Sequence, residues 1–290
     1  MVASTIASAL DRFLGRPQFS LRTRESYDQD LALIRRRIGD QPVAALTPEI
    51  AADYLAAQAH LAPSTYNRRF AALRSFIGWC MKQGWLVSNP LAQQERLPER
   101  RLPPRALNPA DVHATLHSIR DRRDRALFWL IYEGGLRCRE ALAIDIEDIN
   151  WTERGIVIRG KGQYRREVFF SKQISRYLDA YLGERGNPTT GPLFVTHRRA
   201  KNPRRTDVTP DGFARLSYRQ ADTLWKHYTP DWDVHQLRHT AITARAARGY
   251  TEVELKQFSG HQSLRSLEIY IAENREAAKR KAREWERNQE

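Results

Sequence analysis

The sequence predicts a mainly α-helical protein with a small β-hairpin, an α+β fold built from two domains. Three observations lead to this prediction: a length of 290 residues, apolar residues at helical spacing over most of the chain, and one pair of β-rich runs around a glycine turn. At roughly 100 to 200 residues per domain, the length fits two domains that each bury a core. Residues 96–105, RLPERRLPPR, carry three prolines and four arginines, which is typical of an extended basic linker. We therefore expect a helical domain over 1–95 and a second domain over 106–290.

The first domain is predicted to contain four helices joined by short connections, at about 2–14, 21–38, 48–59 and 64–83. Thr47 before Pro48 is a favourable helix start, and Gly84 fits a helix end. In the last helix the apolar residues recur every three or four positions, which indicates a core face. They are Phe70, Leu73, Phe76 and Ile77. The arginines of this helix either form a solvated surface or follow a DNA groove.

The second domain mixes helices with one predicted hairpin. Strands are expected over 155–159 and 165–170, on either side of Gly160-Lys161-Gly162, because glycines favour a tight turn between two β-rich runs. Helices are expected at about 109–120, 121–133, 136–143, 172–184, 210–226, 233–248, 251–258 and 264–271. Thr251 and Glu254 have the spacing of a capping box, Asp233 is a helix N-cap, and Gly249 is a helix end.

Composition excludes several classes of protein. The chain is 28% charged and 41% hydrophobic, values typical of a globular protein rather than a disordered or fibrous one. The longest apolar run, 126–132, is far shorter than the ~20 residues that cross a bilayer, and the N-terminus lacks the basic and apolar regions of a signal peptide. Cys80 and Cys138 alone cannot make a disulfide framework or a cysteine-based zinc site. We expect a cytoplasmic protein with no membrane partner.

Charge is the most informative number. Lysine and arginine total 48 against 34 acidic residues, a net charge of +14, and 40 of the 48 are arginine. The planar guanidinium binds phosphate oxygens in a bidentate way, so the bias favours a nucleic acid partner. A genome rich in G and C, which encodes arginine freely, is a second explanation. The positions of the basic residues must decide between the two.

The motif search finds no nucleotide or metal signature. Walker, GxGxxG and HExxH patterns are absent. His235 and His239, four residues apart, resemble a metal pair with His261 as a third ligand, but Arg238 shares that helix face and would repel a dication. We expect neither a metal nor a cofactor.

The same region reads better as an anion site. His235 and Arg238, three residues apart, emerge on one helix face. Arg137 follows a Gly-Gly turn, with Glu140 placed one helical turn later to orient it. Each of these residues also has an ordinary structural explanation, as a surface, turn, capping or core residue. The order of the segments is therefore the stronger evidence.

Taken in order, the segments resemble the tyrosine recombinase family, also called phage integrases. YEGGLRCREALAIDIEDI is similar to the family's first arginine box, RGKGQYRREVFF to its β-hairpin lysine, HQLRHTAI to its His-x-x-Arg box, and SGHQSLRSLEIY to its Gly-His and tyrosine segment. The stretch STYNRRFAALRSFIGWCMKQGWLVSNPL resembles the end of the family's core-binding domain. The resemblance spans about residues 20–275 and is to the simpler, Xer-like two-domain members. Gly134, Ser259 and Gln163-Tyr164 depart from the usual pattern.

The resemblance implies a catalytic set and its chemistry. The set is Arg137, Lys161, His235, Arg238, His261 and Tyr270, with Glu140 in support. It implies a site-specific recombinase that cleaves and rejoins double-stranded DNA through a 3′-phosphotyrosine, without metal or cofactor. The implied rivals are a type IB topoisomerase-like enzyme and a catalytically idle DNA-binding regulator.

The last helix of the first domain and the basic linker supply the DNA-contact candidates. They are Thr65, Asn67, Arg68, Arg69, Arg74, Arg100 and Arg101. The expected assembly is a homotetramer on two synapsed sites and a monomer when free, associated with the nucleoid of a prokaryotic cell and encoded by a phage or mobile element. Residues 273–290 either form a helical tail, as their composition favours, or remain frayed. In similar recombinases a C-terminal segment docks on the neighbouring subunit, and Trp285 is the expected anchor of that contact.

Overall fold

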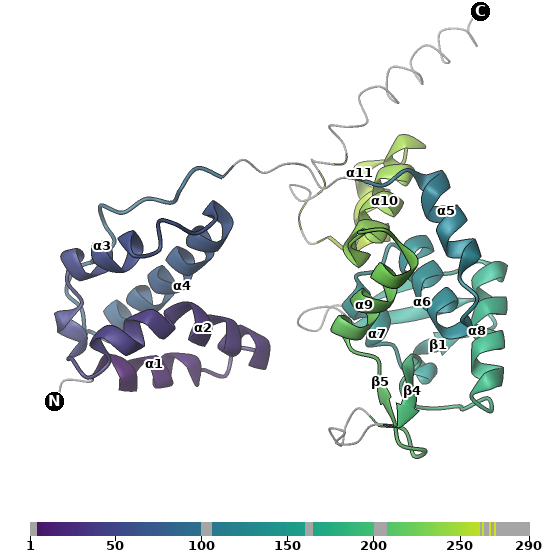
Figure 1. Cartoon of the computed structure of the whole chain (residues 1–290), viewed down its shortest axis with the longest axis horizontal. Helices are drawn as coiled ribbons and strands as arrows, with labels where there is room; N and C mark the ends of the chain where they lie inside the picture. Colours follow the sequence, from purple (N-terminus) through teal and green to yellow (C-terminus); the bar gives the residue numbers. More distant parts are fainter. Residues whose placement is uncertain are drawn as a thin grey trace, which may run out of the picture. The chain divides into compact units, whose positions relative to one another are not determined.

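The computed structural model describes residues 5–99, 106–159, 165–199 and 208–261 and the single residues 263, 267 and 270. The chain forms two compact units, residues 1–102 and 103–290, whose helices and strands are labelled in Figure 1. In the described part, no helix is long and apolar enough to cross a membrane. The predicted tail over 273–290 and most of the predicted helix over 264–271 lie outside the described residues.

Over its described residues, the first unit contains four α-helices and one short 3₁₀ turn. They are α1 (Ile6–Leu14), α2 (Leu21–Ile38), η1 (Val43–Ala45), α3 (Pro48–Ala56) and α4 (Pro63–Lys82). The side chains of Thr5, Ser20 and Thr47 cap α1, α2 and α3, as short hydroxyl side chains do at helix starts. Phe13, with no exposed surface, packs its ring against that of Phe76 of α4. The apolar face predicted for α4 is the buried one.

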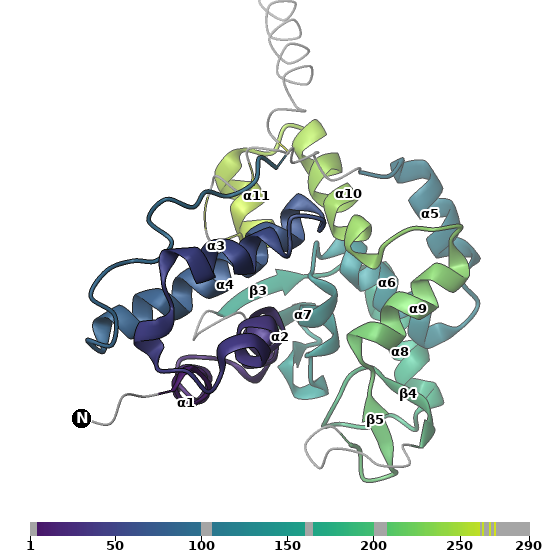
Figure 2. The same cartoon turned by 60° about the vertical axis from the view of Figure 1, so that its left-hand side comes forward.

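The second unit contains seven α-helices in its described part. They are α5 (Pro109–Ser118), α6 (Arg122–Glu133), α7 (Cys138–Leu142), α8 (Lys172–Glu184), α9 (Tyr218–Tyr228), α10 (Val234–Ala247) and α11 (Glu252–Ser259). Helix α6 is buried from Ala126 to Tyr132 and contacts α5, α7, α8 and α10. In the turned view of Figure 2, α10 lies beside α11. A helix that is apolar all round forms the centre of a core.

The described part of the second unit also contains two small antiparallel sheets. Strands β1 (Ile149–Asn150), β2 (Gly155–Arg159) and β3 (Arg165–Phe169) form one sheet in that order, and β4 (Val195–Arg199) pairs with β5 (Phe213–Arg215) in the other. The predicted hairpin is confirmed, with Gly155 opposite Phe169 and Arg159 opposite Arg165. The mainly helical α+β fold class is likewise confirmed.

The helix predicted over 210–226 is wrong in its first part. Residues 213–215 form β5, and α9 begins only at Tyr218. The cause is the run Thr209-Pro210-Asp211-Gly212, in which Gly212 has a φ of +85° and the Thr209 amide donates to the Phe213 carbonyl at 2.8 Å. Proline, aspartate and glycine together favour a turn, so the chain reverses there instead of continuing as a helix.

Candidate active site

The first arginine box forms a turn followed by a short helix, as predicted. Gly135 has a φ of +56°, and Arg137 is the N-cap of α7. Glu140 accepts from the Arg137 backbone amide at 3.0 Å and from its guanidinium at 2.6 Å. The side chain of Arg137 remains 41% exposed. Its guanidinium is thus held in one orientation while it is still open to solvent and to a ligand.

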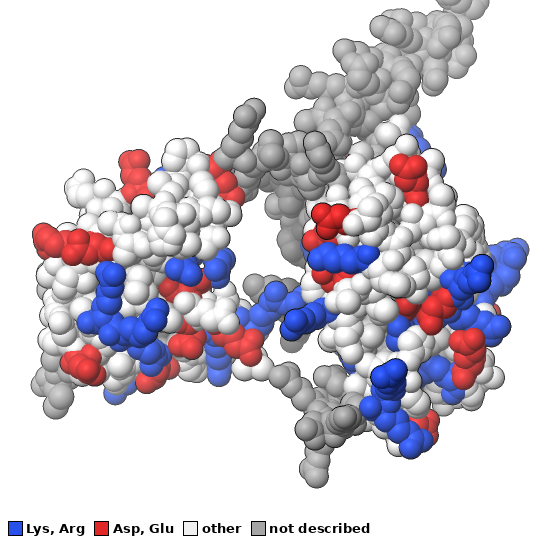
Figure 3. All heavy atoms as spheres, viewed as in Figure 1, with Lys and Arg blue, Asp and Glu red and all other residues white. Residues whose placement is uncertain are grey.

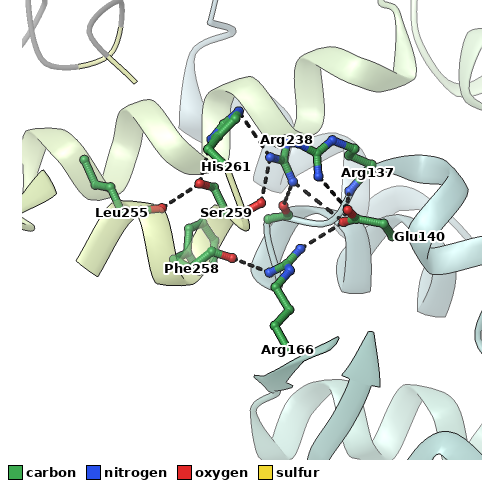
Figure 4. Close-up of polar contacts among 9 residues, drawn as sticks. Arg137, Glu140, Arg166, Arg238, Leu255, Phe258, Ser259 and His261 are labelled. Atoms are coloured by element: carbon green, nitrogen blue, oxygen red, sulfur yellow. Dashed lines mark hydrogen bonds and ion pairs between the residues drawn. The ribbon is translucent and has the colours of Figure 1, made fainter. Parts of the chain in front are cut away.

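One carboxylate links three arginines from distant parts of the chain. Besides Arg137, the Glu140 carboxylate accepts from Arg166 of β3 at 2.9 Å and lies 3.8 Å from Arg238 of α10, as Figure 4 shows. Burial alone would raise the pKa of Glu140. Hydrogen bonding to the Arg137 amide, together with the charges of Arg166 and Arg137, outweighs burial and lowers that pKa. Glu140 is therefore ionised at neutral pH.

Arg238 is a buried cation held by two backbone carbonyls. Its side chain is 2% exposed and donates to the Gly135 carbonyl at 2.6 Å and to the Ser259 carbonyl at 2.7 Å. Burial, and then the neighbouring Arg137 charge, lowers the pKa of Arg238 to about 10, so the guanidinium stays charged at neutral pH. Arg238 joins the arginine box to the end of α11.

Two arginines cap the C-terminal end of α11. The last carbonyls of a helix have no partner within the helix; here Arg166 binds the Phe258 carbonyl at 2.5 Å and Arg238 binds the next one. Gly260 follows with a φ of +66°, and a Cβ at that position would lie 2.5 Å from the Arg166 side chain. Glycine at 260 thus permits both the left-handed turn and the close approach of Arg166.

His261 is fixed by both of its ring nitrogens. Ser259, fully buried, donates its hydroxyl to the Leu255 carbonyl at 2.6 Å and lies 2.7 Å from Nδ1 of His261. Nε2 of His261 lies 3.4 Å from the Arg238 guanidinium. Since a guanidinium only donates, Nε2 accepts and Nδ1–H donates to Ser259. Burial, then Arg238, lowers the pKa of His261 to about 3, so the ring is neutral.

Tyr270 lies in the same region, between two imidazoles. Its side chain is 4% exposed, and its hydroxyl hydrogen-bonds Nδ1 of His239. The Tyr270 ring stacks on His239 with centroids 5.6 Å apart and lies 6.2 Å from the His261 ring. His235 packs edge-on against His239 at 4.7 Å. His239 of α10 and His261, which follows α11, therefore flank the tyrosine, and His235 packs against His239.

The charges of this cluster do not balance. Among the described residues, Arg137, Arg166 and Arg238 surround the single carboxylate of Glu140. Such an excess of positive charge around one point attracts an anion such as a phosphodiester. The site can hold a phosphate and present a tyrosine hydroxyl to it.

The other predicted site residues belong to the first unit or lie outside the described residues. Lys161 lies outside the described residues, between the ends of β2 and β3. Thr65, Asn67, Arg68, Arg69 and Arg74 lie on α4, and Arg100 and Arg101 are outside the described residues. Arg68 pairs with Asp30 at 2.6 Å, and Arg69 donates to Gln58 at 2.8 Å. The amide of Asn67 donates to the Leu97 carbonyl and accepts from the Leu97 backbone amide, which leaves one N–H and one lone pair for another partner.

The described residues offer one group with the composition of a metal site, and it is already satisfied internally. Asp121, Asp124 and His197 lie close together. Arg123 donates to Asp124 at 2.7 Å and the Tyr228 hydroxyl donates to it at 2.9 Å, while Asp121 caps α6 and pairs with His197 at 2.9 Å. These contacts stabilise the start of α6, so we assign this group a structural role.

Two family models cover most of the chain. The phage integrase family matches residues 105–277, and the phage integrase N-terminal SAM-like domain matches residues 10–84. The chain belongs to the phage integrase family. The predicted Xer-like tyrosine recombinase, and with it the enzyme class, is confirmed.

Individual relatives of this recombinase agree. It is 29% identical over 275 residues to the tyrosine recombinase XerC of Mycobacterium tuberculosis (strain ATCC 25177 / H37Ra), covering 87% of this chain and 88% of the relative. It is 26% identical over 294 residues to XerC of Mycobacterium sp. (strain JLS), covering 92% and 93%.

Solved structures share the fold. The Tn1549 transposon integrase, solved in complex with a circular intermediate DNA, superposes with a TM-score of 0.71 at 14% identity, covering 97% of this chain and 99% of that one. The XerH site-specific recombinase bound to palindromic difH superposes with a TM-score of 0.68 at 19% identity, covering 97% and 85%.

Sequence reasoning missed three contributors to the site. In the sequence Arg166 is only one residue of the segment RGKGQYRREVFF, His239 is a candidate only as a metal ligand, and Ser259 is only a departure from the family pattern. The sequence signal for Arg166 is its place in β3 near Lys161. No sequence pattern signals that Tyr270 and His239, 31 residues apart, touch each other.

Proposed function

We propose that this recombinase cleaves and rejoins double-stranded DNA at specific sites through a 3′-phosphotyrosine, with Tyr270 as the nucleophile. The observation that carries the proposal is the cation-rich cluster around Glu140 next to a buried tyrosine hydroxyl. Arg137 and Arg238 clamp the non-bridging oxygens, where charge develops during transfer at phosphorus. His235 and His261 complete the pocket around the phosphate.

Cleavage forms the bond from the tyrosine oxygen to phosphorus and breaks the bond from phosphorus to the 5′ oxygen. We assign protonation of that leaving oxygen to Lys161, because a lysine on the hairpin next to the arginine box suits a general acid. The covalent intermediate retains the energy of the phosphodiester bond. Rejoining therefore consumes no nucleotide cofactor.

The deciding experiment is covalent trapping. A duplex nicked near the cleavage position loses a short fragment after cleavage, so the adduct accumulates and is seen on a denaturing gel. We expect Tyr270→Phe to bind this DNA like the wild type and to form no adduct, because only one hydroxyl is removed. Tyr250→Phe, at a tyrosine that is 44% exposed, is the matched control and should form the adduct normally. Adduct formation by Tyr270→Phe at the wild-type level contradicts the assignment.

A second assay separates recombination from topoisomerase activity. A recombinase exchanges strands between two copies of its site, whereas a type IB topoisomerase-like enzyme relaxes supercoiled plasmid that lacks the site. We expect exchange and no relaxation of the site-free plasmid. A pure DNA-binding regulator would form no adduct in the first assay.

We also propose a homotetramer on two synapsed sites and a monomer in the absence of DNA, acting at the nucleoid where its substrate lies. Strand exchange between two duplexes needs two cleaved half-sites in each, hence four active sites. Mass measurement of the protein alone and on a full site tests this proposal. A stable tetramer without DNA, or exchange by a dimer, contradicts it.

A further inference from the structure

The nucleophile rests against an imidazole outside the set assigned so far. The Tyr270 hydroxyl hydrogen-bonds Nδ1 of His239, and the two rings stack with an interplanar angle of 25°. Tyr270 is 4% exposed and packs in a cluster with Ile242, Leu255 and Leu267. A buried hydroxyl requires a polar partner, and His239 supplies it.

The charge state and the tautomer of His239 together set the direction of this hydrogen bond. Burial, then the nearby His235 ring and the Arg238 charge, lowers the pKa of His239 to about 4. The ring is therefore neutral at physiological pH, so one of its two nitrogens carries a lone pair. In the tautomer with its proton on Nε2, Nδ1 accepts from the tyrosine hydroxyl, whose proton then points at a basic nitrogen.

His261 is not positioned to accept a proton from the Tyr270 hydroxyl. Its Nδ1–H donates to Ser259 and its Nε2 accepts from Arg238, so both nitrogens are engaged. Its ring centroid is 6.2 Å from that of Tyr270. Of these two imidazoles, only that of His239 faces the hydroxyl oxygen.

We propose that His239 is a further catalytic residue, the base that takes the Tyr270 proton as the phenolic oxygen attacks phosphorus. This inference rests on the proposed function and deepens it. The proton moves from Oη of Tyr270 to Nδ1 of His239, the oxygen–phosphorus bond forms, and the 5′ oxygen leaves with a proton from the general acid. On rejoining, the imidazolium returns its proton to Tyr270.

The phosphodiester itself makes the transfer feasible. Arg238, which shares α10 with His239, opposes a positive charge on the imidazole in the empty site. A bound phosphate anion between the arginines offsets that repulsion, and its charge grows in the transition state. The base is thus weak without DNA and strengthens when the substrate is in place.

The recombination site is first recovered from genomic DNA fragments that the purified protein binds. The test is then single-turnover cleavage of a nicked duplex that carries this site. The variants are His239→Ala, His239→Asn, whose amide can hydrogen-bond a hydroxyl but cannot take its proton, and His227→Ala. His227 is exposed on α9 and is the matched control. Equal DNA binding and equal melting temperature verify that each variant is folded.

We expect both His239 variants to cleave about 10²-fold more slowly than wild type at pH 7, within the usual range for loss of a general base. Their rate should rise about tenfold per pH unit, because the proton must then leave to hydroxide, whereas the wild-type rate stays nearly flat from pH 6 to 8. Added imidazole should restore His239→Ala and leave wild type unchanged.

A substrate with sulfur in place of the bridging 5′ oxygen separates base from acid. A thiolate leaves without a proton, so this substrate should rescue Lys161→Ala and should not rescue His239→Asn. Rescue of His239→Asn by sulfur overturns the inference. Cleavage by His239→Asn at the wild-type rate at pH 7 also overturns the inference. Faster cleavage by either His239 variant overturns it too, because His239 would then hold the tyrosine back instead of activating it. If wild type itself forms no adduct, the proposed function fails as well.

Discussion

Arg238 serves both the fold and the chemistry, whereas Arg137 serves mainly the chemistry. Arg238 is 2% exposed and binds two carbonyls, while Arg137 is 41% exposed and binds only the Glu140 carboxylate in the contacts described. Lysine keeps the charge but loses the planar fork. The two arginines therefore allow catalytic and structural losses to be told apart.

We expect Arg137→Lys and Arg238→Lys each to slow adduct formation by about 10² to 10³-fold, the usual cost of one lost donor to a transition-state oxygen. DNA binding should weaken little. Arg238→Lys should also lower the free energy of unfolding by ~1–3 kcal/mol, because buried carbonyls lose their donors, while Arg137→Lys leaves it nearly unchanged. Equal loss of stability in the two variants, measured by urea titration, contradicts this assignment.

The neutral histidines make stability depend on pH. The pKa of His261 is lowered to about 3 and that of His239 to about 4, from 6.5 in the unfolded chain. Below pH 6.5 these histidines bind protons in the unfolded state but not in the folded state. The free energy of unfolding is therefore at its full value above pH 6.5 and falls as the pH drops toward 4. Each histidine contributes a slope of at most ~1.4 kcal/mol per pH unit.

Urea titrations at pH 7.0 and 5.5 measure this effect, and we expect the wild type to lose stability between them. His261→Asn should show a smaller loss, because one such titration is removed. His227→Ala should show the full loss. A pH dependence that is the same in His261→Asn and wild type would refute the neutral state of His261.

At the scale of elements, the end of α11 is a joint between three segments of the second unit. Arg166 of β3 and Arg238 of α10 bind its last two carbonyls, and both arginines reach Glu140 of α7. The position of His261 therefore depends on a strand and two helices that are distant in sequence. Arg166 is a positioning residue.

We expect Arg166→Ala to reduce cleavage at least tenfold with little change in DNA binding, because α11 loses one of its two caps. Gly260→Ala should destabilise the protein by ~1–3 kcal/mol, since its φ is positive and its Cβ would clash with Arg166. The double variant should lose less free energy of unfolding than the two single variants lose in sum, because removing the Arg166 side chain removes the clash. If the losses of stability of the two single variants, measured by urea titration, add up strictly in the double variant, the proposed contact of Arg166 with the end of α11 is contradicted.

At the scale of the whole molecule, the net charge of +14 is carried by both units. Figure 3 shows lysine and arginine side chains in groups on each of them, with acidic side chains between. Such a surface binds DNA largely by releasing counterions, and each neutralised phosphate adds ~0.9 to the slope of log affinity against log salt.

We expect a steep fall of DNA affinity with salt, measured by fluorescence anisotropy on one duplex. Arg74→Ala, at an exposed position of α4, should reduce the slope by about one if Arg74 contacts a phosphate. Lys226→Ala, whose ammonium pairs with Asp222 at 2.9 Å, is the matched control and should leave the slope unchanged. A flat salt response would contradict a role for the charge in DNA binding.

Several elements could be predicted because their signals are local. The N-cap at Asp233, the capping box at Thr251 and Glu254, and the Arg137–Glu140 pair each span two or three residues, a range over which side-chain type dictates geometry. The prediction of a helix over 210–226 was wrong in its first part for a local reason too. Its start contains a turn sequence that competes with helix formation.

The sequence by itself determined the fold class, the family and the order of the chemical groups, because each of these depends on the spacing of residue types along the chain. Only the tertiary structure decided which groups touch. Arg238 reaches Gly135 across 103 residues, Arg166 reaches Phe258 across 92, and Tyr270 reaches His239 across 31. Such contacts form when the core around α6 brings distant segments together, and burial then sets the charge states of His239 and His261. Neither the contacts nor the desolvation that follows from them leaves a periodic trace in sequence.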